Sequence, residues 1–165
     1  MVLETTICFL NRHDTKSNYF KLHTHNCYEI IYFVKGNGNA FINGKSYSVS
    51  AGSYCIIPPH AEHVEKFDGY GEVLFIGFDY NSPNYILPEG NCPTDKVVTK
   101  SYFNDIFNEF KRQEDGFKEA AEYLLRLFLL TLLRNANTNY VKCKDLNYIK
   151  TYIEQYAEQK INFRE

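Results

Sequence analysis

Three side chains that can bind a metal ion or a polar small molecule lie within seven residues near the start of the chain. His23 and His25 are two residues apart, and Glu29 follows in the stretch KLHTHNCYEIIYFVKGNG. Residues two apart on a strand face the same side, so both imidazoles are expected to point one way. Two further histidines, His60 and His63, follow in GSYCIIPPHAEH. The two stretches together supply imidazole nitrogens and a carboxylate oxygen.

Donors of this kind suit a mixed metal site with open coordination positions. Such a site takes Zn, Mn, Fe, Ni or Cu, and the candidate ligands are His23, His25, Glu29 and His63. The alternative is that these side chains form hydrogen bonds with an organic molecule, or with one another, inside a pocket. The geometry of the ligands and the groups behind them decide between the two. The hypothesis of a metal site depends on all four residues together, because a single histidine on a strand is more often a hydrogen-bonded core residue than a ligand.

The elements that must position these residues are short strands in the first half of the chain. Six segments rich in Ile, Val, Phe and Tyr are separated by Gly, Asn, Pro or Asp: FKLHTH, YEIIYFVKG, NAFINGKSYSVSAG, SYCIIPP, HVEKF and EVLFIGFD. This spacing predicts an antiparallel sandwich or barrel. Asn43 and Gly44 predict a two-residue hairpin turn, because a type I′ turn needs positive φ at both central positions. Pro58 and Pro59 cannot lie in a central strand, so they end one.

The second half of the chain reads as helices after an irregular connector. Residues 81–100 contain three prolines and a glycine, and from there the apolar period changes from two to about 3.6. Helices are expected over residues 101–114 and 117–135. After a polar break, another helix is expected to begin at Asp145, a residue type favoured at the N-cap. Asn162 resembles the start of a further capped helix, so the sequence ends where a helix is expected to continue.

The helix expected over 117–135, FKEAAEYLLRLFLLTLLRN, is apolar around most of its circumference. A helix of this kind cannot be satisfied by lying on a single surface. A second copy of the chain is the simplest additional cover, and the alternative is a helix enclosed between the barrel and its neighbour. The expected dimerisation residues are Tyr123, Leu124, Leu127, Phe128 and Leu130.

Composition excludes several classes of function. The formal net charge of -2 provides no basic face for nucleic acid. The longest apolar run, near 127–133, is too short to span a membrane, and the first residues lack the features of a signal peptide. Five widely spaced cysteines without a C-x-x-C pair predict reduced thiols and a cytoplasmic protein.

The histidine-rich stretches resemble the two motifs of the cupin family. The first motif reads G-x5-H-x-H-x3-E-x6-G, and the stretch from Ser17 to Gly36 is similar to it, with Ser17 replacing the leading glycine. The second reads G-x5-P-x-G-x2-H-x3-N, and the stretch from Gly52 to Phe67 is similar, with His60 replacing glycine and Phe67 replacing asparagine. The resemblance covers roughly residues 17–67. It implies a double-stranded β-helix barrel in which the four candidate ligands point inward.

The resemblance narrows when the helical half is added. HTHNCYEIIYFVKGNG resembles the start of the cupin in AraC-type transcription factors, and LNYIKTYIEQYAEQKIN resembles the opening helix of their DNA-binding domain. The family implies a mainly β fold with C-terminal helices: a cupin jelly-roll barrel that binds an effector, followed by an α-helical dimerisation segment. The chain then comprises a cupin over 1–80, the connector over 81–100, two dimerisation helices over 101–136, and a linker with the first helix of a truncated helix-turn-helix domain over 137–165.

The expected function is therefore the sensing of a small molecule, either a sugar or a small organic acid. The expected assembly is a homodimer that binds DNA only through the missing C-terminal part. No binding to membranes is expected. The expected effector-binding residues are His25, Glu29, Ile31, Phe33 and His63, since alternate residues of a strand share a side. The implied cofactor is a divalent transition metal, Zn, Mn, Fe or Ni, as a candidate only. The alternative is a metal-dependent cupin enzyme, a dioxygenase or isomerase, with substrate on the open metal positions. Against it, nearly half of the sequence is helical, and no catalytic residue is assigned.

Overall fold

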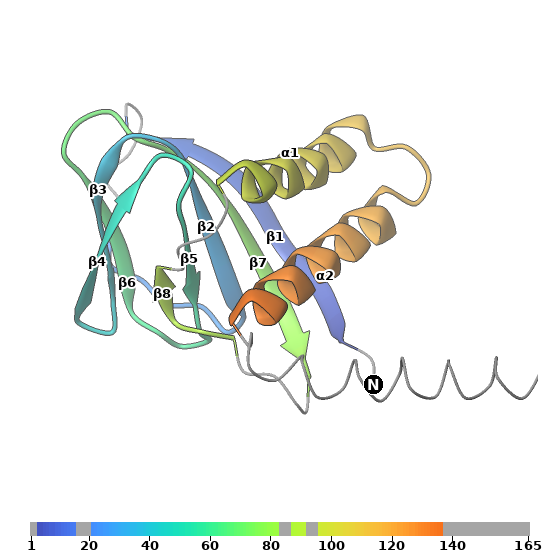
Figure 1. Cartoon of the computed structure of the whole chain (residues 1–165), viewed down its shortest axis with the longest axis horizontal. Helices are drawn as coiled ribbons and strands as arrows, with labels where there is room; N and C mark the ends of the chain where they lie inside the picture. The colour runs from blue at the N-terminus through green and yellow to red at the C-terminus, as the bar shows by residue number, and fades with distance from the viewer. Residues whose placement is uncertain (1–2, 16–20, 83–86, 92–95, 137–165) are drawn as a thin grey trace, which may run out of the picture. The chain divides into compact units, whose positions relative to one another are not determined.

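The computed structural model describes residues 3–15, 21–82, 87–91 and 96–136. Within them the chain forms eight strands and two helices (Figure 1). The elements in chain order are β1 (Glu4–Asp14), β2 (Tyr28–Lys35), β3 (Asn37–Ile42), β4 (Lys45–Ser50), β5 (Tyr54–Ile57), β6 (His63–Phe67), β7 (Glu72–Asn81), β8 (Gly90–Asn91), α1 (Lys96–Arg112) and α2 (Phe117–Ala136). Contacts divide the chain into two units, and the boundary falls within α2, after Leu129.

The strands form two antiparallel sheets. One has five strands in the order β1-β7-β2-β5-β8, and the other has three in the order β4-β3-β6. One core cluster joins the sheets, and its buried members are Ile31, Phe33, Ala40, Ile42, Val49, Cys55, Ile57, Ala61 and Val73. The expected architecture, mainly β with C-terminal helices and a cupin-type pair of sheets, is confirmed at this level.

The helices cover the other face of the five-stranded sheet. Tyr32 of β2 stacks on Phe103 of α1 with ring centroids 4.8 Å apart, and Tyr54 of β5 meets Phe128 of α2 at 5.5 Å. Figure 1 shows both helices on the side of this sheet that faces away from β3, β4 and β6. Because both faces are covered, β2 and β5 are continuous buried runs without polar alternation.

The predicted turns are confirmed. β3 and β4 pair up to Ile42 and Lys45, and the two residues between them, Asn43 and Gly44, have φ of 49° and 77°. These are the positive values that a type I′ turn needs. β5 ends at Ile57, directly before the Pro58-Pro59 pair. The register that places Lys45 opposite Ile42 therefore follows from local signals in the sequence.

Strand β1 is the main element that the sequence analysis missed. It pairs with β7 along its whole length, with a bulge between Ile7 and Phe9. A bulge inserts one residue and reverses the side-chain alternation, which hides the period of two in ETTICFLNRHD. The described part of the predicted strand FKLHTH, residues 21–25, is instead irregular with one β-bridge, between His23 and His63.

The connector and the first predicted helix also differ from expectation. Residues predicted as an irregular connector include β8, which pairs with β5, and α1 begins at Lys96 rather than at residue 101. The β-branched Val97 and Val98, which favour strands, concealed this first turn. Ser17 and the features predicted within 137–165 lie outside the described residues. Within the described part, no helix is long and apolar enough to cross a membrane.

Candidate functional site

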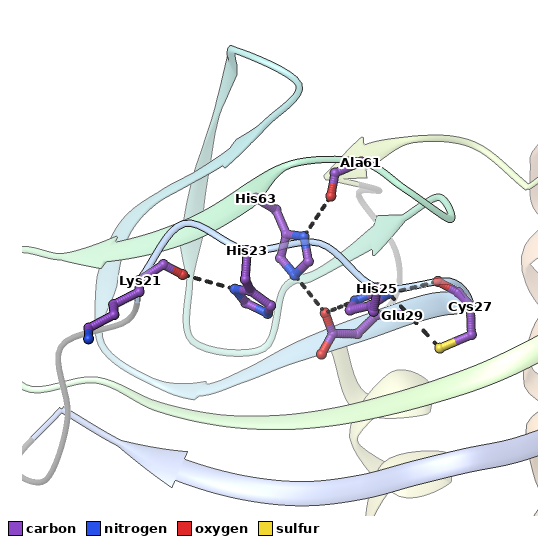
Figure 2. A network of polar contacts seen from close by, with 7 residues as sticks. All are labelled: Lys21, His23, His25, Cys27, Glu29, Ala61 and His63. Atoms are coloured by element: carbon purple, nitrogen blue, oxygen red, sulfur yellow. Dashed lines mark hydrogen bonds and ion pairs between the residues drawn. The ribbon is translucent and has the colours of Figure 1, made fainter.

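The four candidate ligands come together where β2 and β6 begin (Figure 2). One donor atom from each of His23, His25, Glu29 and His63 lies within 4.8 Å of the others. Backbone hydrogen bonds hold the two chain segments together: His23 N–H donates to the His63 carbonyl at 3.2 Å, and His63 N–H donates to the His23 carbonyl at 3.0 Å. The segment before β2 is thus fastened to β6 at the site itself.

Glu29 lies between two of the imidazoles. Its Oε2 is 2.9 Å from Nε2 of His25 and 3.0 Å from Nε2 of His63. Burial alone would raise the pKa of Glu29, but the hydrogen bond from His25 and the contact with His63 outweigh it, so the pKa is lowered. His63 is fully buried, and its Nε2 makes an ion-pair contact with Glu29 but no well-aligned hydrogen bond to any described residue.

The histidine rings are oriented from behind by backbone carbonyls. The Nδ1 atoms of His23, His25 and His63 lie 2.9, 2.8 and 2.9 Å from the carbonyl oxygens of Lys21, Cys27 and Ala61, respectively. A carbonyl oxygen only accepts, so each Nδ1 carries a proton and donates it. In a neutral ring the Nε2 lone pair is then free to bind a metal ion at the shared centre, whereas a hydrogen bond from Nε2 to Glu29 requires a ring protonated on both nitrogens. This is the arrangement by which proteins set the tautomer of metal-binding histidines.

The donor set fits a divalent transition-metal ion. Three imidazole nitrogens and one carboxylate oxygen are borderline donors of the kind that Zn, Mn, Fe and Ni accept. Metal–ligand distances of about 2.0–2.2 Å place neighbouring donors about 3 Å apart, and the two contacts of Glu29 have this length. The His63 Nε2, buried without a hydrogen bond among the described residues, is the atom that an ion would satisfy.

A cavity of about 600 Å³ adjoins the cluster. Its described lining residues are Phe9, His13, Lys21, His23, His25, Glu29, Ile31, Glu65, Val73 and Phe75. Three of the rings form an aromatic wall: Phe75 stacks on His13 at 5.5 Å and meets the edge of Phe9 at 6.3 Å. The cavity therefore has an apolar side supplied by β1 and β7 and a polar side supplied by the ligand cluster and β6.

The structure brings most of the predicted effector-binding residues to this cavity. His25, Glu29 and Ile31 line it, and His63 contacts Glu29 beside it. Phe33 lies deeper, fully buried in the core with its ring centroid 6.0 Å from that of Phe67, and it is not among the described lining residues. The alternation that placed Ile31 and Phe33 on one side was correct, but the cavity ends before Phe33.

Several lining residues were missed in the sequence analysis. Phe9 and His13 were missed because β1 was not predicted. Glu65 carried a usable signal, since it lies two residues after His63 in HVEKF and therefore shares its side of β6. It is only 5% exposed. Burial, and then the negative charge of Glu29, raises the pKa of Glu65 to about 7.

The five predicted dimerisation residues lie on different faces of α2. Tyr123 and Leu127 are 56% and 46% exposed, while Leu124 and Leu130 are half-buried. Phe128 is only 2% exposed and packs against Tyr54 within the same chain. Its role is therefore in the intramolecular core, which is the enclosed arrangement considered as the alternative for this part of the helix.

Residues 5–67 match the family model of the AraC-like ligand binding domain. Among curated proteins, the chain is similar to the HTH-type transcriptional activator RhaS of Escherichia coli O1:K1 / APEC and to the same activator of Enterobacter sp. (strain 638). Each is 22% identical, over 87% of this chain and 59% of the relative. The chain thus spans 59% of the length of these relatives.

Among solved structures, the chain is similar to the EutQ protein of Clostridium difficile, with 20% identity, 47% of this chain and 68% of that chain covered, and a TM-score of 0.38. A protein of Thermotoga maritima described as a predicted oxalate decarboxylase is 21% identical, with 46% and 78% covered and a TM-score of 0.40.

Proposed function

Residues 5–67 belong to the family of AraC-like ligand binding domains, and from this premise we propose that the chain is the effector-sensing part of a transcription regulator. One observation carries the proposal: the cavity of about 600 Å³ within this domain. Pockets for small molecules have volumes of roughly 300–1,000 Å³ and combine an apolar lining with a few polar groups. The proposed effector is a sugar or a small organic acid.

The proposed binding mode uses both sides of the cavity. Phe9 and Phe75 supply aromatic surface for a carbon face of the effector, since aromatic rings bury large apolar area at low entropic cost. His25 and Glu29 supply polar atoms at the opposite side. When a divalent metal is bound by His23, His25, Glu29 and His63, it supplies a positive charge with open positions for ligand oxygen atoms.

Strand β1 offers a route from the cavity to the helices. Its residues Phe9 and His13 line the cavity, while its first residues are held by α2. The N–H of Ile7 donates to Glu122 at 3.1 Å, and Arg126 donates to the hydroxyl and the carbonyl of Thr5 at 3.1 and 3.0 Å. A ligand that moves Phe9 or His13 therefore acts on a strand that is already bonded to the helix. We propose this strand as the coupling element between effector and helix.

Dimerisation and DNA binding complete the proposal. Tyr123 and Leu127 are large exposed side chains one turn apart on α2, and a second copy of the chain would cover them. DNA binding belongs to the remaining length that the curated relatives have beyond this chain. In that setting the regulator acts in the cytoplasm, and effector binding shifts the equilibrium between two arrangements of the dimer.

The sensing proposal is tested by thermal unfolding in the presence of sugars, polyols, amines and small carboxylic acids. At a concentration of 100 Kd, a true effector is expected to raise Tm by about 5 °C or more. The substitution His13→Trp fills the aromatic side of the cavity and should abolish this rise. Ser46→Trp, at an exposed position of β4, is the matched control and should preserve it. An equal rise in both variants would place binding outside the cavity and refute the proposal.

The dimer proposal is tested by sedimentation velocity at micromolar concentration. The chain is expected to be a dimer, and Leu127→Glu or Tyr123→Glu should weaken it at least tenfold, because each buries a charge in an apolar contact. Lys118→Glu, exposed on the same helix, is the control. A wild-type monomer, or a dimer indifferent to both substitutions, would remove the role proposed for α2.

The second candidate function is a metal-dependent cupin enzyme, a dioxygenase or an isomerase. The observation that favours it is the complete set of three histidines and one glutamate around one centre. The two functions are separated by loading the chain with Fe(II), Mn or Ni and measuring oxygen consumption and substrate loss with the compound that shifts Tm. Turnover of that compound would favour the enzyme, and binding without turnover would favour the sensor.

A further inference from the structure

Glu65 of β6 is a buried carboxyl group that the ligand cluster does not use. It lines the cavity and is only 5% exposed to solvent. Its Oε1 is inaccessible to solvent and makes no hydrogen bond with any described residue. An unsatisfied buried polar atom destabilises a fold, and native proteins seldom keep one without a reason. The cavity that Glu65 faces is the place from which a partner would come.

The residues around Glu65 restrict the chemistry of the group that could bind it. Among the described residues no lysine, arginine or histidine forms an ion pair with Glu65, although Glu29 forms two with His25 and His63. The carboxylate of Glu29 and the imidazoles of His63 and His25 lie near Glu65, but both imidazoles form their ion pair with Glu29 and not with Glu65. The aromatic rings of Phe9 and Phe75 line the same cavity. The partner must therefore donate a hydrogen bond to Glu65 and offer carbon surface to the rings.

We infer that Glu65 is the specificity-determining residue of the cavity and binds a hydroxyl or ammonium donor of the effector, so that small acids without such donors are rejected. This inference rests on the proposed sensing function and deepens it by naming the chemistry of the ligand. A carboxylate oxygen accepts hydrogen bonds from both kinds of donor. While Glu65 is ionised, a donor-free anion would leave Oε1 unsatisfied and would also meet the negative charge of Glu29, and both effects lower its affinity.

The first test needs no ligand. Glu65→Met replaces the carboxyl with an apolar side chain of similar length and removes the unsatisfied atom. The Tm of the ligand-free chain is expected to rise by roughly 2–6 °C, since groups kept for binding are often costly to stability. Glu62→Met, at an exposed position before the same strand, is the matched control and should change Tm by less than about 1 °C. A fall in Tm for Glu65→Met would mean that the fold needs the carboxyl, and would overturn the inference.

The second test separates the two donor classes. The compounds are glycerol, erythritol and glucose as polyols, 1,3-diaminopropane and putrescine as amines, and malonate and succinate as acids, each at 50 mM in a thermal unfolding assay. Polyols or amines are expected to stabilise the wild type, and Glu65→Met should weaken their binding at least tenfold. Glu65→Gln keeps an acceptor oxygen but loses the charge, so it should retain binding of polyols and lose binding of amines.

The outcomes that contradict the inference are distinct from failure of the sensing function. Stabilisation by malonate or succinate alone, with no response to polyols or amines, would refute the role of Glu65 while leaving a small-molecule sensor. Binding of polyols or amines that is unchanged in Glu65→Met would do the same. A wild type that responds to none of the compounds would contradict both proposals together.

Discussion

Strand β2 has two faces of opposite chemistry. Alternate residues of this one short strand form each face. Glu29 and Ile31 face the cavity, whereas Tyr32 stacks on Phe103 of α1. The face toward the helices is closed and apolar. The other face contacts His63 through Glu29 and borders the cavity that Glu65 also lines, and His63 and Glu65 both belong to β6 of the three-stranded sheet. Among the described residues, His63 Nε2 and Glu65 Oε1 lack a hydrogen bond. The five-stranded sheet thus packs tightly on the helices with one face and borders a polar, incompletely satisfied site with the other.

The difference teaches how a small domain can keep a costly binding site. An unsatisfied buried polar group such as Glu65 costs about 1–3 kcal/mol, a large fraction of a total stability of roughly 5–15 kcal/mol. The packing of Tyr54 and Phe103 around Phe128, on the helix-covered face of the five-stranded sheet, offsets such a cost. On this view the helices stabilise the sheet on which the site is built, in addition to any role between subunits.

The largest loss of stability is expected when the packing between α2 and the five-stranded sheet is disrupted. Phe128→Ala should lower the free energy of unfolding by about 3–5 kcal/mol, because a fully packed aromatic ring leaves a cavity when it is removed. Leu127→Ala, one position earlier and 46% exposed, should cost less than about 1 kcal/mol. Denaturant unfolding measures both. Equal losses in the two variants would mean that the helix does not pack on the sheet through Phe128.

The next largest effect is expected on metal binding, when one of the candidate ligands is removed. His63→Ala removes a fully buried candidate ligand and should weaken binding of a divalent metal by about 100-fold or more. Elemental analysis of protein purified without added metal or affinity-tag nickel, with metal titration of both forms, measures the change. His60→Ala, exposed beside the site, is the control and should keep the wild-type metal content. A wild type that binds no added ion would instead assign the cluster to an organic effector.

The two faces should also differ in their response to pH, because Glu29, His63 and Glu65 are buried on the cavity side. The pKa of Glu65 is raised to about 7, above its ordinary value of 4.5, so the folded state binds more protons and stability falls as pH rises through 7. Burial opposes protonation of His63, but Glu29 raises the pKa of His63 overall, so the stabilisation it provides is also lost as pH rises. Glu29, with a lowered pKa, instead loses its contribution when pH falls below about 4.5.

For the metal-free chain, these shifts predict that the free energy of unfolding falls by on the order of 2 kcal/mol between pH 5 and pH 8. Denaturant unfolding in the presence of a chelator measures it. Glu65→Gln should flatten most of the slope, whereas Phe128→Ala should lower stability equally at both pH values. A slope that survives in Glu65→Gln would assign it to His63 alone.

The smallest effect concerns the loop that carries the second motif. His60 stands where the cupin motif has glycine, and it keeps a left-handed backbone with φ of 64° while its N–H donates to the His25 carbonyl at 2.8 Å. His60→Gly should therefore raise the free energy of unfolding by about 0.5–1 kcal/mol, because only glycine adopts this conformation without strain. His60→Ala should not. If glycine is the less stable of the two in urea unfolding, the left-handed conformation is not what limits the loop.

The elements that the sequence predicted well are those defined by short-range chemistry. The hairpin at Asn43 and Gly44 was predictable because its turn type demands two residues with positive φ. The closed end of β5 was predictable because proline cannot donate in a central strand. By contrast β1 escaped prediction, since its bulge at Cys8 and its pairing with the distant β7 leave no regular local period.

The residue types and spacing alone determined the candidate histidine–glutamate cluster, the β-then-α order of the chain and the family that roughly residues 17–67 resemble. Only the tertiary structure decided that Phe9, His13 and Glu65 share a cavity with that cluster, that Phe33 does not, and that Phe128 packs inside its own chain. The physical reason is range. Turns and side-chain alternation depend on neighbouring residues, whereas a cavity and the burial of a helix face depend on which distant segments pack together.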